Sequence, residues 1–228
     1  MFNPDKTNDI EVNLSILNKY FNICYIPNKI FFKNDNIITV ANSIGGLSSC
    51  SEEVKNMLNY YDYVSTRDSN YKGKYHTVPD CAVLTKYLFD FKIQSFNNEL
   101  SLLEINNKYI AMQFSYDSIN DNLIETISNI SNFLKIPIYL FIAGIAPYHD
   151  SFEEYEKIIK KINTIYGIYI FKETNIWKIC CLIANSYITI GTSLHVRIIA
   201  FCYSKIRYTF SNNVNKNSKH YLFINKMG

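Results

Sequence analysis

The sequence predicts an α/β protein built on parallel sheets, and three observations indicate this class. Short apolar runs typical of buried strands alternate with segments of helical periodicity. Glycine and proline are scarce, at 7 and 5 residues, so each one marks a turn or an element end. In the second half the predicted elements follow the order β-α-β-α-β-α-β-α-β. That order is typical of a doubly wound, Rossmann-like domain with a parallel sheet.

The first half contains three strand–turn units within 50 residues. Residues 37–46 form an apolar run that breaks at two glycines, and Ser51 then precedes a helix with acids in its first turn. We expect a helix over 10–22, a strand over 37–46, a helix over 51–58, a strand over 63–66 and a strand and turn over 76–84. These units favour a first parallel α/β layer.

A polar, asparagine-rich stretch over 89–107 lacks sustained periodicity and is typical of a linker. We place a domain boundary near 93–105. This gives a partial N-terminal α/β domain over 1–95 and a C-terminal Rossmann-like, donor-binding domain over 106–228.

The second half restarts the alternation of strands and helices. Its strands are expected over 109–114, 138–143, 166–171, 187–190 and 206–210, and its helices over 119–135, 152–162, 175–186 and 193–203. The helix at 152–162 has acids early and lysines late, which suits the helix dipole.

Composition narrows the functional class. The net charge is only +3 and no basic stripe is present, which argues against nucleic-acid binding. Six cysteines without a C-x-x-C pair favour reduced, buried thiols, with metal binding or disulfides as the alternatives. The N-terminus lacks a signal-peptide pattern, and no apolar run approaches the roughly 20 residues of a membrane span. We therefore expect a cytoplasmic protein without a transmembrane segment, a metal site or a cofactor.

Four positions follow predicted strands, where ligands bind in open parallel sheets. They are Asn42–Gly46, Arg67-Asp68, Gly144–Asp150 and Gly191–His195. No G-x-S-x-G, P-loop, H-E-x-x-H or G-x-G-x-x-G pattern is present. Hydrolase, NTPase, zinc-peptidase and dinucleotide-binding functions therefore lose their usual sequence support.

The segment Gly191–His195 is the most specific of the four. Gly191 allows close approach of the backbone, and Thr192 or Ser193 can cap the next helix, whose N–H groups attract an anion. His195 lies in the first turn and could donate a hydrogen bond, carry a charge or act as a general acid. An ordinary capped helix with a half-buried histidine is the alternative.

The first half offers weaker candidates. Arg67 could clamp a carboxylate or phosphate, or could pair locally with Asp68. Ser43 and Gly45 lie in a turn that could bring backbone close to a ligand, or that could be a plain tight turn.

Taken in order, these segments resemble the polysaccharide pyruvyl transferase family. The likeness covers roughly residues 37–210 and rests on four motifs. They are Ala41-Asn-Ser-Ile-Gly-Gly46, Val64-Ser-Thr-Arg-Asp68, Val78-Pro-Asp-Cys81 and Ala184–Ala200 with its Ser193-Leu-His195 core. Many members have Arg at the position of Ser193, Gly at that of Val196 and Pro at that of Cys81.

The resemblance implies two Rossmann-like domains arranged as in GT-B glycosyltransferases, of which we expect the first to be incomplete here. It implies transfer of a pyruvyl group from phosphoenolpyruvate to a sugar of a cell-surface glycan or its lipid-linked precursor. His195 would contact phosphoenolpyruvate and assist proton transfer. Arg67 would contact the anion across the interdomain cleft, and the turn residues Ser43, Gly45, Gly191, Thr192 and Ser193 would complete the binding site.

Two other hypotheses remain open at this stage. A GT-B glycosyltransferase would place the diphosphate of a nucleotide sugar at residues 192–195. A shortened, non-catalytic Rossmann module would fold and associate with a partner. A homo-oligomer formed through uncovered sheet edges or faces is a further expectation.

Overall fold

The computed structural model describes residues 38–47, 50–102, 108–144, 150–210, 220–221 and 223–224. The chain divides into two compact units, Met1–Pro79 and Asp80–Gly228, and each is described by itself. The helix expected over 10–22 lies outside the described residues. The domain boundary expected at 93–105 stays a prediction.

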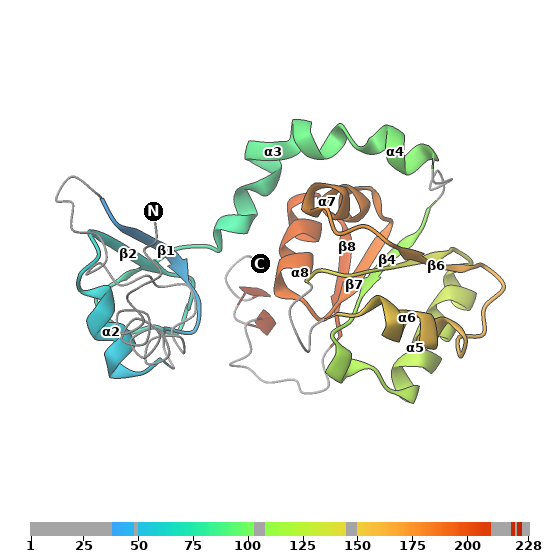
Figure 1. Ribbon diagram of the computed structural model, residues 1–228, viewed down its shortest axis with the longest axis horizontal. Coiled ribbons are helices and arrows are strands. Elements are labelled where there is room, and N and C mark those ends of the chain that lie inside the picture. Colours follow the sequence, from blue (N-terminus) through green and yellow to red (C-terminus); the bar gives the residue numbers. More distant parts are fainter. Residues whose placement is uncertain are drawn as a thin grey trace, which may run out of the picture. The chain divides into compact units, whose positions relative to one another are not determined.

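The first unit is a parallel three-stranded sheet in the order β1-β2-β3 (Figure 1). Its strands are β1 (Val40–Ile44), β2 (Tyr63–Thr66) and the short β3 (His76–Thr77). Helix α2 (Glu52–Leu58) connects β1 to β2, and the Ser51 hydroxyl accepts from the Val54 N–H, so the cap predicted from sequence is confirmed. Leu47, Leu58 and Val64 form the buried core.

The second unit is built on a five-stranded parallel sheet in the order β6-β5-β4-β7-β8. The strands are β4 (Ile110–Gln113), β5 (Ile138–Phe141), β6 (Ile168–Phe171), β7 (Ile188–Gly191) and β8 (Ile206–Thr209). Because the chain starts in the middle strand, runs to one edge and then crosses to the other side, the sheet is doubly wound. The Rossmann-like fold expected for the second half is confirmed at this level.

Helices cover both faces of this sheet. They are α5 (Asp121–Leu134) and α6 (Phe152–Ile159) on one face, and α7 (Ile176–Asn185) and α8 (Leu194–Cys202) on the other (Figure 1). Two apolar cores result, because alternate strand residues point to opposite faces. Ile110, Met112 and Ile190 pack towards α5 and α6, whereas Tyr109 and Ala111 pack towards α7 and α8.

Helix starts in this unit follow from polar residues placed one position before each helix. Asn120 Oδ1 accepts from Leu123 N at 2.9 Å, Ser151 Oγ from Glu154 N, and Asn175 Oδ1 from Trp177 N at 2.9 Å. Such caps satisfy N–H groups that lack partners within the helix, and each is worth about 1 kcal/mol.

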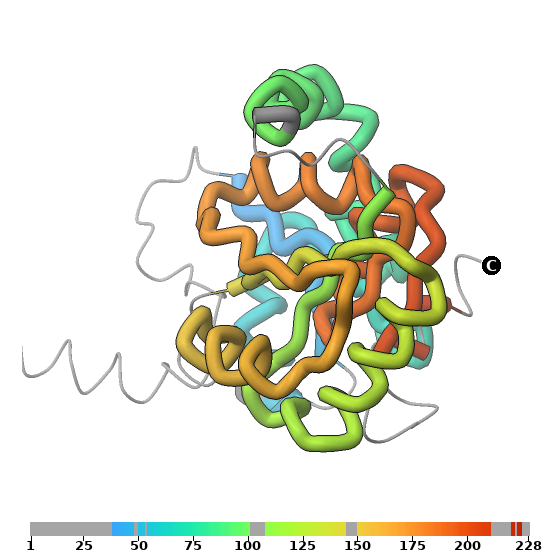
Figure 2. The backbone as a smooth tube through the Cα atoms, turned by 90° about the vertical axis from the view of Figure 1, so that its right-hand side faces the viewer, coloured from blue at the N-terminus to red at the C-terminus, as the bar shows by residue number. Residues whose placement is uncertain are grey.

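The stretch predicted as an irregular linker contains helices. A 3-10 turn η3 (Cys81–Leu84) leads into α3 (Thr85–Gln94) and α4 (Asn97–Leu102). In Figures 1 and 2, α7 lies between the sheet and the α3–α4 layer, and the fully buried Ile93 joins α3 to the core next to α7. The expectation failed because α3 has apolar residues on more than one side, which obscures the helical period. None of the helices in the described ranges is long and apolar enough to cross a membrane.

Candidate active site at the start of α8

The direction of winding of the second sheet reverses between β4 and β7. These strands are neighbours in parallel register, with Gln113 opposite Gly191, while the helices that follow them, α5 and α8, lie on opposite faces. Open α/β sheets bind ligands at this switch point, outside the carboxyl ends of the strands. The turn that contains the predicted residues Gly191, Thr192 and Ser193 lies there.

A buried amide holds this turn in place. Gln113 is 0% exposed and ends β4. Its side-chain oxygen accepts from the Ser193 N–H at 2.9 Å, and its side-chain nitrogen donates to Asp150 Oδ1 at 2.8 Å. Asp150 Oδ2 in turn accepts from the Ala143 N–H at 2.6 Å. The ends of β4, β5 and β7 are therefore joined through side chains, which makes the turn rigid.

Gly191 is needed for packing within the turn. A Cβ atom at this position would lie 3.1 Å from Gln113 Oε1, 3.2 Å from the Gln113 carbonyl oxygen and 3.3 Å from Val196 Cγ1. These separations are tighter than ordinary van der Waals contact, so a side chain would push the turn away from β4. Gly191 therefore lies close to the protein's own chain, and its approach to a ligand stays a prediction.

Thr192 and Ser193 take different roles. Thr192 Oγ1 accepts from the Ser115 N–H at 2.9 Å, which joins the turn to the second residue after the end of β4. Ser193 is the N-cap residue of α8, but its hydroxyl makes no capping hydrogen bond. An uncapped helix start presents N–H groups and the positive end of the helix dipole, which suit a phosphate or carboxylate.

His195 lies in the first turn of α8 with 61% of its side chain exposed. Its Nε2 is 3.8 Å from Oδ2 of Asp80, a carboxylate that is only 4% exposed. The other oxygen of Asp80 accepts from the Ala82 N–H at 3.0 Å and starts η3. An accessible imidazole thus lies in the first turn of a helix without a side-chain cap, with a buried carboxylate at ion-pair distance.

The predicted residues of the first unit form a second cluster at the ends of β1 and β2. Arg67 follows β2, and a Cβ on Gly45 would overlap the guanidinium, coming within 2.7 Å of Arg67 Nη2. Ser43 is buried with φ at 57°, a left-handed conformation that non-glycine residues rarely adopt. Its N–H donates to Ser65 Oγ at 2.9 Å, and its hydroxyl donates to the Pro79 carbonyl at 3.0 Å.

The structure brings Arg67 together with the turn of Ser43 and Gly45, which was named separately, whereas the second cluster is the single segment Gly191–His195. Ser43, Gly45 and Arg67 lie together in the first unit, and Gly191, Thr192, Ser193 and His195 lie together in the second. Asp68, the alternative partner considered for Arg67, accepts from the Gly46 N–H at 2.9 Å. No group of three or more metal-ligating side chains occurs among the described residues.

Sequence comparison identifies the family of the chain. The sequence model of the family described as polysaccharide pyruvyl transferase matches residues 13–212, which is most of the chain. The chain belongs to the polysaccharide pyruvyl transferase family. A search of curated proteins gave no match.

Three site residues of this family member were missed by the sequence analysis. Gln113 was included in an apolar strand, although a polar residue ending a buried run was a usable signal. Asp150 ended the candidate segment Gly144–Asp150, but its hydrogen bond to Gln113 was missed, and Ser151 caps α6. Asp80 was quoted only as part of a motif, because its proximity to His195 spans 115 positions and cannot be read from local spacing.

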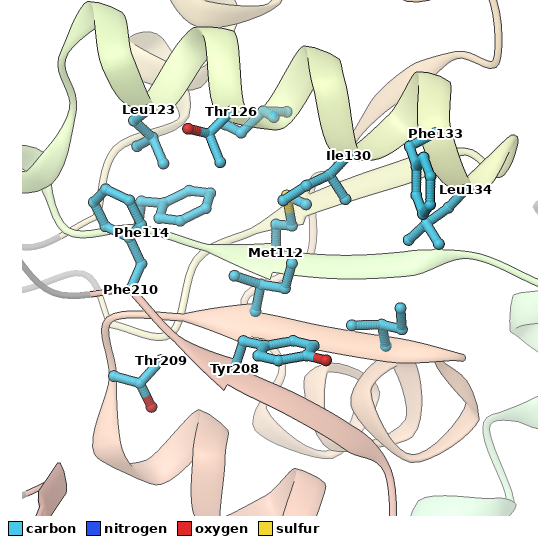
Figure 3. A pocket seen from close by; sticks show the side chains of 13 residues that line it. Met112, Phe114, Leu123, Thr126, Ile130, Phe133, Leu134, Tyr208, Thr209 and Phe210 are labelled. Atoms are coloured by element: carbon cyan, nitrogen blue, oxygen red, sulfur yellow. The ribbon is translucent and has the colours of Figure 1, made fainter.

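A separate apolar cavity of about 360 Å³ lies on the α5 face of the sheet (Figure 3). Side chains from α5, β4, β7 and β8 line it, including Met112, Ile130 and Tyr208. No lysine, arginine, histidine or acid is among the lining residues. The cavity therefore lacks the charge that an anionic donor needs, and the α8 start remains the candidate site.

Proposed function

We propose that the protein transfers a pyruvyl group from phosphoenolpyruvate to two hydroxyls of a sugar, in a cell-surface glycan or its lipid-linked precursor in the cytoplasm. The observation that carries this proposal is His195 in the first turn of α8, beside an uncapped helix start at the switch point. Membership of the family supplies the reaction class. A GT-B-like pair of Rossmann-like domains is part of the same proposal.

The donor carries a phosphate and a carboxylate, and the helix start suits one of these anions. Backbone N–H groups at the start of α8 would hold that anion without a bound metal or cofactor. Arg67 is the cation that we assign to the other anion, because a guanidinium matches the geometry of either group. Gly45 leaves the space that the guanidinium occupies.

The reaction requires a group that can give a proton to phosphoenolpyruvate. One proton must reach the methylene carbon of the enol to form the methyl group of the product. The central carbon then accepts two sugar oxygens, phosphate departs with its bridging oxygen, and the second hydroxyl proton leaves with the phosphate or with solvent. We assign the first proton to His195, because an imidazole can give up a proton near neutral pH. The first sugar hydroxyl returns its proton to that imidazole as its oxygen bonds to the central carbon.

The test is a transfer assay with purified protein, phosphoenolpyruvate and a panel of glycosides that present two neighbouring free hydroxyls. We expect phosphate release that depends on the glycoside, and a new methyl singlet of a pyruvyl ketal in the proton NMR spectrum. His195→Asn should lower the rate by on the order of 10²-fold or more. His76→Asn, at an exposed histidine of β3, is the matched control and should leave the rate unchanged. Sugar transfer from a nucleotide sugar without ketal formation would contradict the proposal.

A further inference from the structure

We infer that Asp80 is a positioning residue that holds His195 as its Nε2–H tautomer, so that Nδ1 is the nitrogen that exchanges a proton with the ligand. The inference rests on the proposed function for its catalytic meaning. Its structural part, the tautomer of His195, stands on the geometry alone. It concerns Oδ2 of Asp80 and Nε2 of His195, which are 3.8 Å apart.

Asp80 is held through both its side chain and its backbone. Its Oδ1 accepts from the Ala82 N–H at 3.0 Å, and its backbone carbonyl accepts from the Val83 N–H at 3.0 Å. Turn η3 is itself fixed against α8, where Cys202 Sγ lies 3.3 Å from the Val83 carbonyl oxygen. Because His195 and Cys202 belong to the same helix, Asp80 and His195 are attached to one rigid assembly of η3 and α8.

Asp80 is much more buried than His195, and their roles differ for this reason. The Asp80 side chain is 4% exposed and the His195 side chain is 61% exposed. A buried carboxylate is costly unless a cation or N–H groups surround it, so a hydrogen-bond donor on the imidazole is favoured on the side that faces Asp80. The exposed ring can meet a ligand, whereas the buried carboxylate cannot.

The chemistry of the two groups then sets the tautomer. An ionised carboxylate only accepts hydrogen bonds, so the imidazole nitrogen that faces it must carry the hydrogen. In the neutral ring the other nitrogen, Nδ1, then holds the lone pair. After an Nδ1–H of the imidazolium has given its proton to the donor, the remaining Nε2–H form is the one that Asp80 stabilises.

The separation of 3.8 Å is an ion-pair distance and exceeds a hydrogen bond by almost 1 Å. Catalytic contacts of this kind tighten when ligand binds. A rotation of the exposed imidazole closes the gap, while the fixed carboxylate stays in place.

The decisive variant is Asp80→Asn. Asparagine keeps an oxygen for the Ala82 N–H and therefore preserves the start of η3. With that oxygen engaged, the amide presents N–H to His195 where the carboxylate presented oxygen. The preferred tautomer of His195 should therefore reverse to Nδ1–H, with Nε2 accepting.

Long-range proton–nitrogen correlation NMR on ¹⁵N-labelled full chain reads this tautomer, with His195 assigned by loss of its signals in His195→Gln. We expect the Nε2–H pattern in the wild type and the Nδ1–H pattern in Asp80→Asn. The kcat for ketal formation should fall by on the order of 10²-fold in Asp80→Asn, with little change in KM for phosphoenolpyruvate. Asp90→Asn is the control, because Asp90 of α3 binds Tyr203 and should affect neither readout.

An Nδ1–H pattern in the wild type, or an unchanged tautomer in a folded Asp80→Asn protein, would overturn the inference. An Nδ1–H pattern in the wild type overturns the inference even if the variant does not fold, whereas support for it comes from the reversal of the tautomer in Asp80→Asn. Because the spectrum needs no turnover, an inactive protein with the expected tautomers would contradict the proposed function and leave the assignment of Asp80 intact.

Discussion

The backbone N–H of Ser193 donates to Oε1 of Gln113 at 2.9 Å, so a buried amide in the central strand sets the position where α8 begins. This one bond joins the end of β4 to the turn that carries the candidate site. The same amide is anchored by Asp150, which also binds the end of β5. The geometry of the turn therefore depends on residues outside the motif that identifies it.

Gln113→Met tests this dependence. Methionine has a similar volume but removes both side-chain hydrogen bonds, which leaves Asp150 Oδ1 and the Ser193 N–H without those partners. We expect the free energy of unfolding to fall by about 1–3 kcal/mol per unsatisfied group. Urea denaturation measures this loss. The control is Gln94→Met, at an amide on α3 with intermediate exposure, where a loss of less than about 1 kcal/mol is expected. Equal effects at the two positions would contradict a special role for Gln113.

Gly45→Ala tests the link between the glycine turn and Arg67. The added methyl group would overlap the guanidinium, so Arg67 must move although the backbone φ at Gly45 is not positive. We expect weaker binding of phosphoenolpyruvate, by about tenfold, with a change in unfolding free energy of about 1–3 kcal/mol. Isothermal titration calorimetry provides the affinity. Gly46→Ala serves as the control, since a Cβ there meets no atom within 4 Å and introduces only strain from φ at 81°. Unaltered affinity in Gly45→Ala would argue against Arg67 as a donor contact.

Tyr155→Phe tests the hydrogen bonds that the Tyr155 hydroxyl makes at the ends of β4 and β5. The Tyr155 hydroxyl accepts from the Phe114 N–H at 2.8 Å and lies 3.0 and 3.1 Å from the carbonyl oxygens of Phe114 and Phe141. Burial raises the pKa of this phenol far above its ordinary value, so the hydroxyl remains a neutral donor. Its removal should lower the unfolding free energy by about 1–3 kcal/mol. Tyr116→Phe, at an exposed tyrosine, should cost less than about 0.5 kcal/mol, and a similar loss at both sites would count against the argument.

Thiol reactivity should separate the cysteines by burial. Burial raises the pKa of Cys180 from 9.0 to about 12 and that of Cys181 to about 11, whereas Cys81 is exposed. At pH 8 we expect rapid labelling of Cys81 by a thiol reagent and labelling of Cys180 and Cys181 only after unfolding. Peptide mass spectrometry after labelling of the wild type and of the variant Cys81→Ser shows which cysteines have reacted.

The same pKa values predict a loss of stability at alkaline pH. A raised pKa in the folded state means that the folded protein retains protons that the unfolded chain loses. The contribution is complete below pH 9 and declines as pH rises from about 9 towards 12. Unfolding free energies that stay constant between pH 8.5 and 10.5 in the wild type would contradict the burial of these thiols.

The strands of the second unit and its helices α5 to α8 were predictable because each has a strong local signal. Runs such as Ile138–Phe141 are apolar on both faces, as buried parallel strands require, and α5 has an apolar stripe ending at the left-handed Lys135. Helices α3 and α4 were missed because their stability comes from packing against α7 more than from their own periodicity.

For the site, the sequence predicted the turns but not the residues from other elements that hold them in place. The glycine and hydroxyl residues at 191–193 are neighbours in sequence, so their pattern is local. Gln113 bonds to this turn from 80 positions away, Asp80 lies beside α8 from 115 positions away, and Asp150 acts through Gln113, so only the order of the elements in the fold brings them together. The position of Gln113 opposite Gly191 follows from the β4–β7 register, which no local pattern specifies.

The central claim is that the start of α8 binds phosphoenolpyruvate through His195. Calorimetric titration of the wild type, His195→Asn and His76→Asn with phosphoenolpyruvate tests it most directly. We predict saturable binding to the wild type and to His76→Asn. In His195→Asn, the loss of a charged hydrogen bond worth about 1.5–3 kcal/mol should weaken binding by roughly 10- to 150-fold. Equal affinity in all three proteins, or binding of UDP- or CMP-sugars with none of phosphoenolpyruvate, would contradict the account.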